Sequence, residues 1–177
     1  MIPDGFVLLL SNHQIGQRLE EIGADLRHQL GNHEVTFVGI LDGALFVMTD
    51  LIRAYQLDAK VDFLRVTSYR GGTESGELTM LSGLTWNVKE HDVVLVDDIL
   101  DSGQTLAFCR QHLMAMGAAS ITSVVLLTKE RHRDFQLENP VVGFRIPDRF
   151  VIGYGLDFEG RFRHLPDIYI KDKEGAE

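Results

Sequence analysis

The sequence predicts an α/β protein in which helices cover both faces of a central, mostly parallel sheet. Short apolar runs rich in β-branched residues alternate with helix-like segments through the middle of the chain, which is the pattern of parallel strands joined by helices. The 177 residues are 45% hydrophobic and 24% charged, values typical of a globular protein. Because no internal repeat or linker-like stretch interrupts them, we expect residues 1–177 to form a single domain.

The first element expected is a helix near the N-terminus. Ser11 or Asn12 is placed to cap this helix, and Gly31 is placed to end it. Its apolar residues recur at helical spacing and would form the buried face: Ile15, Leu19, Ile22, Leu26 and Leu30.

The next segments predict a strand, a helix and a second strand. Val35–Leu41 is a buried apolar run, followed by a tight turn at Asp42–Ala44 and a helix over Leu45–Tyr55. Val61–Tyr69 is β-branched and aromatic, as strands are. Arg70–Gly76 contains three glycines and little to pack, which is typical of a mobile loop.

The second half continues the alternation and then becomes irregular. Val93–Val96 predicts a third strand, Thr105–Met116 a helix that Gly117 ends, and Ile121–Leu127 a fourth strand. Short apolar runs follow, separated by glycine, proline and charge: Val141–Val142, Phe150–Tyr154 and Ile168–Ile170.

The totals exclude several classes of function. A formal net charge of −9 at pH 7 argues against unaided binding to nucleic acid or to an anionic membrane. No apolar stretch approaches the length of a membrane span, and the first residues lack the basic flank of a signal peptide. The single cysteine, Cys109, rules out an internal disulfide framework. We therefore expect a cytoplasmic protein with neither nucleic acid nor a membrane as partner.

The stretch Val93–Phe108, VVLVDDILDSGQTLAF, carries the strongest functional signal. Asp97 and Asp98 directly follow an apolar strand, at the edge of the sheet where open α/β proteins bind ligands. The loop Asp101–Thr105 then opens a helix. Its backbone N–H groups, its hydroxyls and the small Gly103 would form a phosphate-binding cradle.

Helix capping by Asp101 or Ser102 is the simpler explanation of this loop. Capping does not account for Asp97 and Asp98, because unpaired carboxylates at a strand end add nothing to stability. A sugar diol or a divalent cation beside them would account for both. The segment therefore predicts one ligand that combines a phosphate, a diol and Mg²⁺.

The same stretch resembles the 5-phosphoribosyl-1-diphosphate (PRPP) motif of the type I phosphoribosyltransferases, in which an apolar strand, two acids and two apolar residues precede an acid, Ser or Thr, Gly, a variable residue and Thr. Other segments resemble the hypoxanthine-guanine phosphoribosyltransferases, the 6-oxopurine branch of that family. They are LLTKERH around Lys129, the stretch Val141–Pro166, and the mobile-loop segment LRVTSYRGGTESGEL. The resemblance covers roughly residues 35–170. It implies the type I fold, with a small hood from the terminal segments and a mobile loop.

The resemblance assigns the phosphoribose end of the site. Asp97 and Asp98 would hold the ribose hydroxyls and help to place Mg²⁺, with Asp157 as a further metal ligand. Arg163 would reach the pyrophosphate. The 5′-phosphate would bind largely to backbone amides of Ser102, Gly103, Gln104 and Thr105.

The resemblance also assigns the base end. Asp101 would act as general base or acid near N7 of the purine. Lys129 would donate to the 6-oxo group, since an ammonium can only donate and so rejects the 6-amino group of adenine. Phe150 would stack on the base, and Val151 would offer its backbone to the guanine edge. From the residues alone, a lysine after a strand is more often solvated, and an aromatic at a strand start is more often core.

Two further segments would complete the site. Ser68 and Tyr69, with the loop after them, would close over a ribosyl cation that water could otherwise intercept. The turn of Leu41, Asp42 and Gly43 would bind pyrophosphate through its amides, at a cis peptide bond in this family. Many relatives carry Lys or Arg at the position of Asp42. A carboxylate there would repel pyrophosphate, so we expect it to point away or to contact a neighbouring subunit.

The resemblance implies a Mg²⁺-dependent transferase of purine salvage, which moves 5-phosphoribose from PRPP to N9 of hypoxanthine or guanine, with xanthine as a further base. It also implies a homodimer or homotetramer. A regulator that binds a nucleotide or PRPP on the same fold is one alternative, against which the charge and the lack of a basic stripe count. A transferase for another base is the second alternative, and Lys129 counts against adenine.

Overall fold

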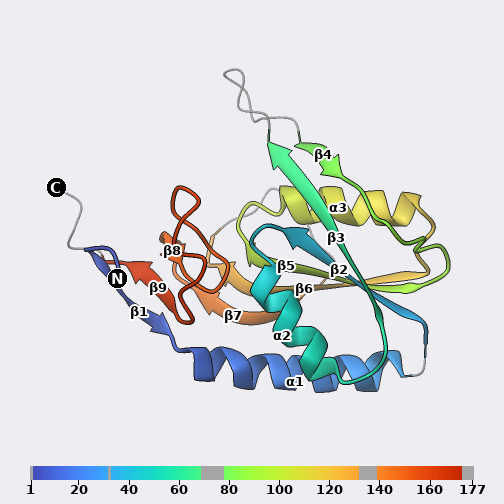
Figure 1. Cartoon of the computed structure of the whole chain (residues 1–177), viewed down its shortest axis with the longest axis horizontal. Coiled ribbons are helices and arrows are strands. Elements are labelled where there is room, and N and C mark those ends of the chain that lie inside the picture. The colour runs from blue at the N-terminus through green and yellow to red at the C-terminus, as the bar shows by residue number, and fades with distance from the viewer. Residues whose placement is uncertain (1, 32, 69–77, 132–138, 173–177) are drawn as a thin grey trace.

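In the part of the chain that the computed structural model describes, six strands form the central sheet, in the order β4-β3-β2-β5-β6-β7 (Figure 1). The structure describes residues 2–31, 33–68, 78–131 and 139–172. Strands β2, β3, β5, β6 and β7 run parallel, and β4 pairs antiparallel with β3. The strands of this sheet are β2 (Val35–Leu41), β3 (Lys60–Ser68), β4 (Leu78–Ser82), β5 (Asp92–Leu100), β6 (Ser120–Lys129) and β7 (Val141–Ile146).

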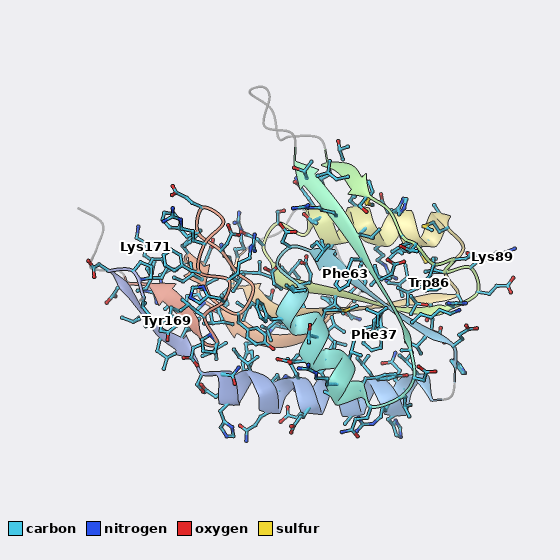
Figure 2. The ribbon with its side chains drawn as sticks, viewed as in Figure 1. Phe37, Phe63, Trp86, Lys89, Tyr169 and Lys171 are labelled. Atoms are coloured by element: carbon cyan, nitrogen blue, oxygen red, sulfur yellow. The ribbon has the colours of Figure 1, made fainter. Side chains whose placement is uncertain are left out.

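Helices cover both faces of the sheet, as the alternating pattern predicts. Helices α1 (Asn12–Leu30) and α2 (Leu45–Tyr55) lie on one face, and α3 (Gln104–Ala115) lies on the other (Figure 1). Side chains in β5 alternate accordingly: Val94 and Val96 pack into the core under α1 and α2, whereas Leu95 packs under α3. Figure 2 shows Phe37 in the first of these cores. Among the described residues, no helix is long and apolar enough to cross a membrane.

Local sequence signals fix the ends of several elements. Ser11 caps α1 in a reciprocal capping box with Gln14, and Gly31 follows the last residue of the helix. The expected ranges of β2 and α2 match the structure at both ends. These elements follow from short-range patterns, which is why their bounds are predictable.

The two chain ends form a second, smaller sheet in the order β1-β9-β8, which is the expected hood. Its strands are β1 (Phe6–Leu10), β8 (Val151–Ile152) and β9 (Ile168–Lys171). The Asn12 N–H donates to Asp167 Oδ1 at 2.7 Å across 155 residues of sequence and ties α1 to this sheet. Neither β1 nor β4 is predicted from the sequence. Each depends on pairing with a strand elsewhere in the chain, which local periodicity does not report.

Strand β5 corrects the expected position of the acidic pair. The sequence predicts a strand that ends at Val96, whereas β5 continues to Leu100 and contains both Asp97 and Asp98. The strand continues past the two acids because it stays paired with β6, where Asp97 lies opposite Val125. The acids therefore lie within a strand rather than after its end.

Candidate active site

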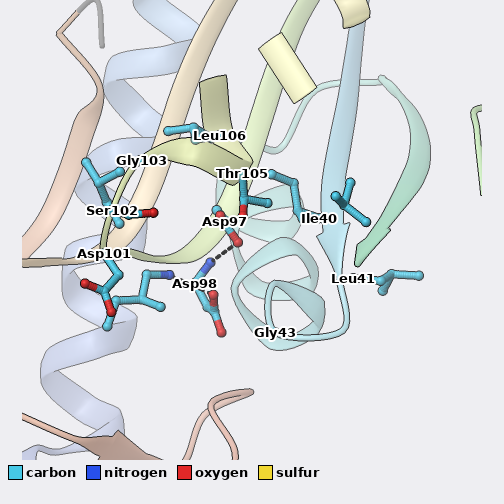
Figure 3. Close-up of a pocket in the computed structure, with 13 residues that line it drawn as sticks. Ile40, Leu41, Gly43, Asp97, Asp98, Asp101, Ser102, Gly103, Thr105 and Leu106 are labelled. Atoms are coloured by element: carbon cyan, nitrogen blue, oxygen red, sulfur yellow. Dashed lines mark hydrogen bonds between the residues drawn. The ribbon is translucent and has the colours of Figure 1, made fainter. Parts of the chain in front are cut away.

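A pocket of about 290 Å³ opens where β2 and β5 separate (Figure 3). Their pairing ends at Gly39 and Val96, whereas β5 stays paired with β6 as far as Leu100. The strand order reverses here, since β3 lies beyond β2 and β6 lies beyond β5, and open α/β sheets bind ligands at such a point. The pocket is lined by Ile40, Leu41, Gly43, Val66, Asp97, Asp98, Ile99, Leu100, Asp101, Ser102, Gly103, Thr105 and Leu106.

The acidic pair forms one wall of the pocket. The Asp97 carboxylate accepts from the Asp98 N–H at 3.0 Å, and the Asp98 carboxylate accepts from the Ile99 N–H at 2.8 Å. Asp97 is 8% exposed. Burial, together with the neighbouring Asp98 carboxylate, raises the pKa of Asp97 well above its ordinary value, and burial raises the pKa of Asp98 as well. Two desolvated carboxylates side by side favour a cation or a pair of hydroxyl donors between them.

The loop after β5 forms the floor. Gly103 is the N-cap residue of α3. Its φ of +87° is a left-handed conformation, which glycine adopts more readily than other residues. The N-cap residue is therefore Gly103 rather than Asp101 or Ser102, and it makes no side-chain cap. Ser102 Oγ nevertheless accepts from the N–H of Gln104, the first residue of the helix, at 3.3 Å. With Gly103 and Thr105 lining the pocket at the start of a helix, the loop has the geometry of an anion cradle.

The turn after β2 faces the acidic pair. The peptide bond between Leu41 and Asp42 is cis, as the family resemblance implies. A Cβ at Gly43 would lie 1.9 Å from Asp98 Oδ2, so a larger residue here would force this carboxylate or the turn to move. The Asp42 side chain pairs with Arg65 of β3 at 3.0 Å, a partner that is not predicted from the sequence.

The segment after β8 brings a cation next to the same turn. A Cβ at Gly155 would lie 2.2 Å from the Gly43 carbonyl oxygen, so the two backbones touch. Arg163 donates to the Gly155 carbonyl and pairs with Asp157 at 2.8 Å. Its charge counters part of the burial effect on the Asp98 pKa. Asp157 and Arg163 therefore lie beside the pocket and are paired with each other.

The opposite end of the pocket carries a second charged cluster. Lys129 is the last residue of β6, rather than a residue after a strand, and its Nζ donates to Asp101 Oδ2 at 3.0 Å. Arg131 donates to Asp101 Oδ1 at 2.7 Å. Asp148 lies 3.5 Å from Lys129. Arg131 and Asp148 are not predicted as site residues, although both lie in segments that carry the family resemblance; sequence order alone does not show that they meet.

An aromatic residue lies at the entry to β8. Phe150 is 43% exposed, so it is not a core residue. Its ring makes edge contacts with Phe158 at 5.6 Å and Phe6 at 6.3 Å between centroids. Val151 is buried in β8 opposite Ile170. The residue expected to stack on the base is therefore an exposed ring that packs against Phe158 and Phe6.

The segment expected to close over the site lies mostly outside the described residues. Tyr69 and the loop after it fall outside the described residues, and Ser68 ends β3.

Within residues 2–31, 33–68, 78–131 and 139–172, no group of three or more His, Cys, Asp or Glu side chains is arranged to hold a metal. Mg²⁺ is commonly bound by one or two carboxylates together with substrate phosphates, so the pair Asp97 and Asp98 fits it.

Comparison with known proteins agrees with this geometry. The model of the phosphoribosyl transferase domain matches residues 8–159. A hypoxanthine-guanine phosphoribosyltransferase of Staphylococcus aureus is 38% identical over 162 residues, which cover 91% of this chain and 90% of the relative. The bifunctional protein TilS/HprT of Listeria monocytogenes is 36% identical over 168 residues, 94% of this chain. The chain spans only 26% of that longer protein's length.

Solved structures give the same result. A hypoxanthine phosphoribosyltransferase of Staphylococcus aureus superposes with a TM-score of 0.89 at 36% identity, covering 97% of this chain and 94% of that one. The enzyme of Trypanosoma cruzi in complex with the product IMP superposes with a TM-score of 0.88 at 28% identity, covering 99% and 100%.

The strand order, the pocket where the order reverses and the hood over it define an α/β protein of the type I phosphoribosyltransferase fold. The chain belongs to the phosphoribosyltransferase family, in its hypoxanthine-guanine branch.

Proposed function

We propose that the protein is a Mg²⁺-dependent transferase of purine salvage. It moves 5-phosphoribose from PRPP to N9 of hypoxanthine or guanine, with xanthine as a third base, and yields IMP or GMP and pyrophosphate. The bond from C1′ to the pyrophosphate oxygen breaks, the bond from C1′ to N9 forms, and the imidazole proton of the base is released. The observation that carries this proposal is that the acidic pair, the cradle and Asp101, which accepts from Lys129, all line one pocket.

The phosphoribose would bind at the separation of β2 and β5. The cradle from Ser102 to Thr105, including Gln104, would hold the 5′-phosphate on its backbone amides. Asp97 and Asp98 would accept from the ribose hydroxyls, which would add donors to two carboxylates that burial destabilises in their charged form. Mg²⁺ held by the acidic pair, with Asp157 as a further ligand, would neutralise charge that develops on the leaving pyrophosphate.

The pyrophosphate would leave along the turn after β2. The amides of Leu41, Asp42 and Gly43 lie where this turn meets the acidic pair. Arg163, next to the same turn, would donate to the pyrophosphate. Ser68 and Tyr69 would contribute to a cover that excludes water.

The base would enter between the hood and the end of β6. Lys129 would donate to the 6-oxo group, and Asp101 would accept the imidazole proton. Phe150 offers an exposed ring for stacking, and the backbone of Val151 would meet the purine edge. Positioning and electrostatic stabilisation would supply most of the rate enhancement.

An assay tests the reaction directly. Purified protein is incubated with PRPP and Mg²⁺ and with each of hypoxanthine, guanine, xanthine and adenine. We expect nucleotide and pyrophosphate with the 6-oxopurines and none with adenine, because Lys129 offers only donors to position 6. Failure to form product with any 6-oxopurine would overturn the proposal.

The domain organisation, the location and the oligomeric state follow from the sequence and from the family resemblance. We propose a single phosphoribosyltransferase domain over residues 1–177, a cytoplasmic location and a homodimer or homotetramer. Cys109 is a buried free thiol, and burial raises its pKa to about 12, so little of it is the reactive thiolate at neutral pH. Light scattering coupled to size-exclusion chromatography measures the oligomeric state, and a monomeric mass would contradict it.

A further inference from the structure

Four charged side chains that the structure describes lie together at the proposed base end of the pocket. The Asp101 carboxylate lies 3.0 Å from Lys129 Nζ through Oδ2 and 2.7 Å from Arg131 Nη1 through Oδ1. The Asp148 carboxylate lies 3.5 Å from Lys129 Nζ and 3.9 Å from Arg131 Nε. Each carboxylate therefore faces both cations, and the four formal charges cancel.

The proposed function requires a change of partners inside this cluster. Lys129 would donate to the 6-oxo group of the base, although its ammonium is engaged with both carboxylates. Its side chain is only 13% exposed, which leaves it little freedom to serve the base without loosening a contact. When the base enters, the Asp101 oxygen that faces Lys129 therefore loses part of its support. Asp101 must nevertheless keep its orientation, because this carboxylate is to accept the imidazole proton.

Arg131 is placed to hold Asp101 through that exchange. It binds the carboxylate oxygen opposite the one that faces Lys129, so the base does not have to displace it. A guanidinium presents several N–H donors in one rigid plane, and Arg131 can face Asp101 and Asp148 at once. We propose that Arg131 is a positioning residue, which keeps the Asp101 carboxylate directed at the base while Lys129 changes partner. This inference rests on the proposed function.

The test compares three single variants with the wild-type enzyme in steady-state kinetics with hypoxanthine and PRPP. Arg131→Gln removes the charge, and Arg131→Lys keeps the charge but lacks the planar fork. Arg145→Gln removes the same charge from an exposed position on the neighbouring strand β7 and is the matched control. Thermal unfolding of each variant verifies that it is folded.

We expect Arg131→Gln to lower kcat about tenfold, the effect of losing one charge-assisted hydrogen bond that orients the proton acceptor. The KM values for hypoxanthine and for PRPP should stay within about twofold, because Arg131 touches neither substrate in this role. Arg131→Lys should recover part of the loss, and Arg145→Gln should behave like the wild type.

Each other outcome overturns the inference. An unchanged kcat in Arg131→Gln removes the positioning role, and a raised KM with unchanged kcat makes Arg131 a substrate-binding residue instead. An equal loss in Arg145→Gln reduces the effect to net charge. A wild-type protein inactive with every 6-oxopurine overturns the proposed function and this inference with it. An active wild type with a fully active Arg131→Gln overturns this inference alone.

Discussion

The Asp42 carboxylate lies 3.0 Å from the guanidinium of Arg65, across the edge of the turn proposed to bind pyrophosphate. A carboxylate beside a pyrophosphate site is unfavourable by charge, and the structure places a cation from the adjacent strand next to it. Both side chains are about half exposed, at 47% and 53%, so solvent weakens the pair. The pair is thus better placed to set the local charge at the turn than to stabilise the fold.

Removal of Arg65 should weaken PRPP binding. In Arg65→Gln the Asp42 carboxylate is left without its partner beside the turn, and we expect the KM for PRPP to rise about two- to fivefold. The double variant Asp42→Asn with Arg65→Gln removes both charges and should return the KM towards the wild-type value. Kinetics at two salt concentrations measure this. A double variant no better than Arg65→Gln would show that Arg65 acts on PRPP itself.

A methyl group at position 43 should disrupt the site. In Gly43→Ala the new Cβ would collide with the Asp98 carboxylate, so the turn or the acid must move. We expect a loss of about 1–3 kcal/mol in the free energy of unfolding, as for other overpacked positions, together with a large loss of activity.

Gly16→Ala is the matched control for that change. Gly16 lies within α1 with open space around its Cβ position, and alanine there should stabilise the helix by up to about 1 kcal/mol. Chemical denaturation measures both variants. Equal stability of Gly43→Ala and wild type would contradict the expected cost of moving the turn or the Asp98 carboxylate.

Replacement of Asp101 should separate turnover from binding. Asp101→Asn keeps the shape but cannot accept the imidazole proton, so we expect kcat to fall about 100-fold or more. Binding of IMP, measured by calorimetry, should be retained. A variant that turns over at the wild-type rate would remove Asp101 from proton transfer.

Low pH should destabilise the sheet at the end away from the pocket, where Asp92 begins β5. The hydrogen bond from Ser120, and the contact with His33, hold the pKa of Asp92 below its ordinary value despite burial. Asp92 therefore contributes stability above its unfolded-state pKa, and this contribution is lost as the pH falls through the lower folded-state value. Ser120→Ala should unfold at a lower temperature than the wild type at neutral pH. The two proteins should converge below about pH 4, and a constant difference at all pH values would contradict this linkage.

Much of the fold is predictable because its signals are local. The spacing of apolar residues in α1 and the apolar run of β2 reflect contacts within one turn or one strand. Strand β1 gives no comparable signal, because five apolar residues become a strand only when β9 pairs with them. The extension of β5 through Asp97 likewise depends on β6.

The site is predictable in part for the same reason. Asp97, Asp98 and the cradle lie in one continuous stretch, so the sequence itself places them together. Arg65 at Asp42, and Arg131 at Asp101, meet only after the chain folds, and a surface arginine carries no sequence mark of its partner. Site residues that are neighbours in the sequence are therefore predictable, whereas partners from distant segments, such as Arg65 and Arg131, are not.

The hood imposes an order on how the protein is made. Strand β1 leaves the ribosome well before its partner β9, because the whole central sheet lies between them in the sequence. Until then Val7 and Leu8, already exposed in the finished strand, belong to an unpaired apolar edge that can pair with another chain. The contact of Phe150 with Phe6, where the base is proposed to bind, also waits for this closure. Synthesis that stops before residue 168 would thus release a chain that lacks this pairing and is prone to aggregate.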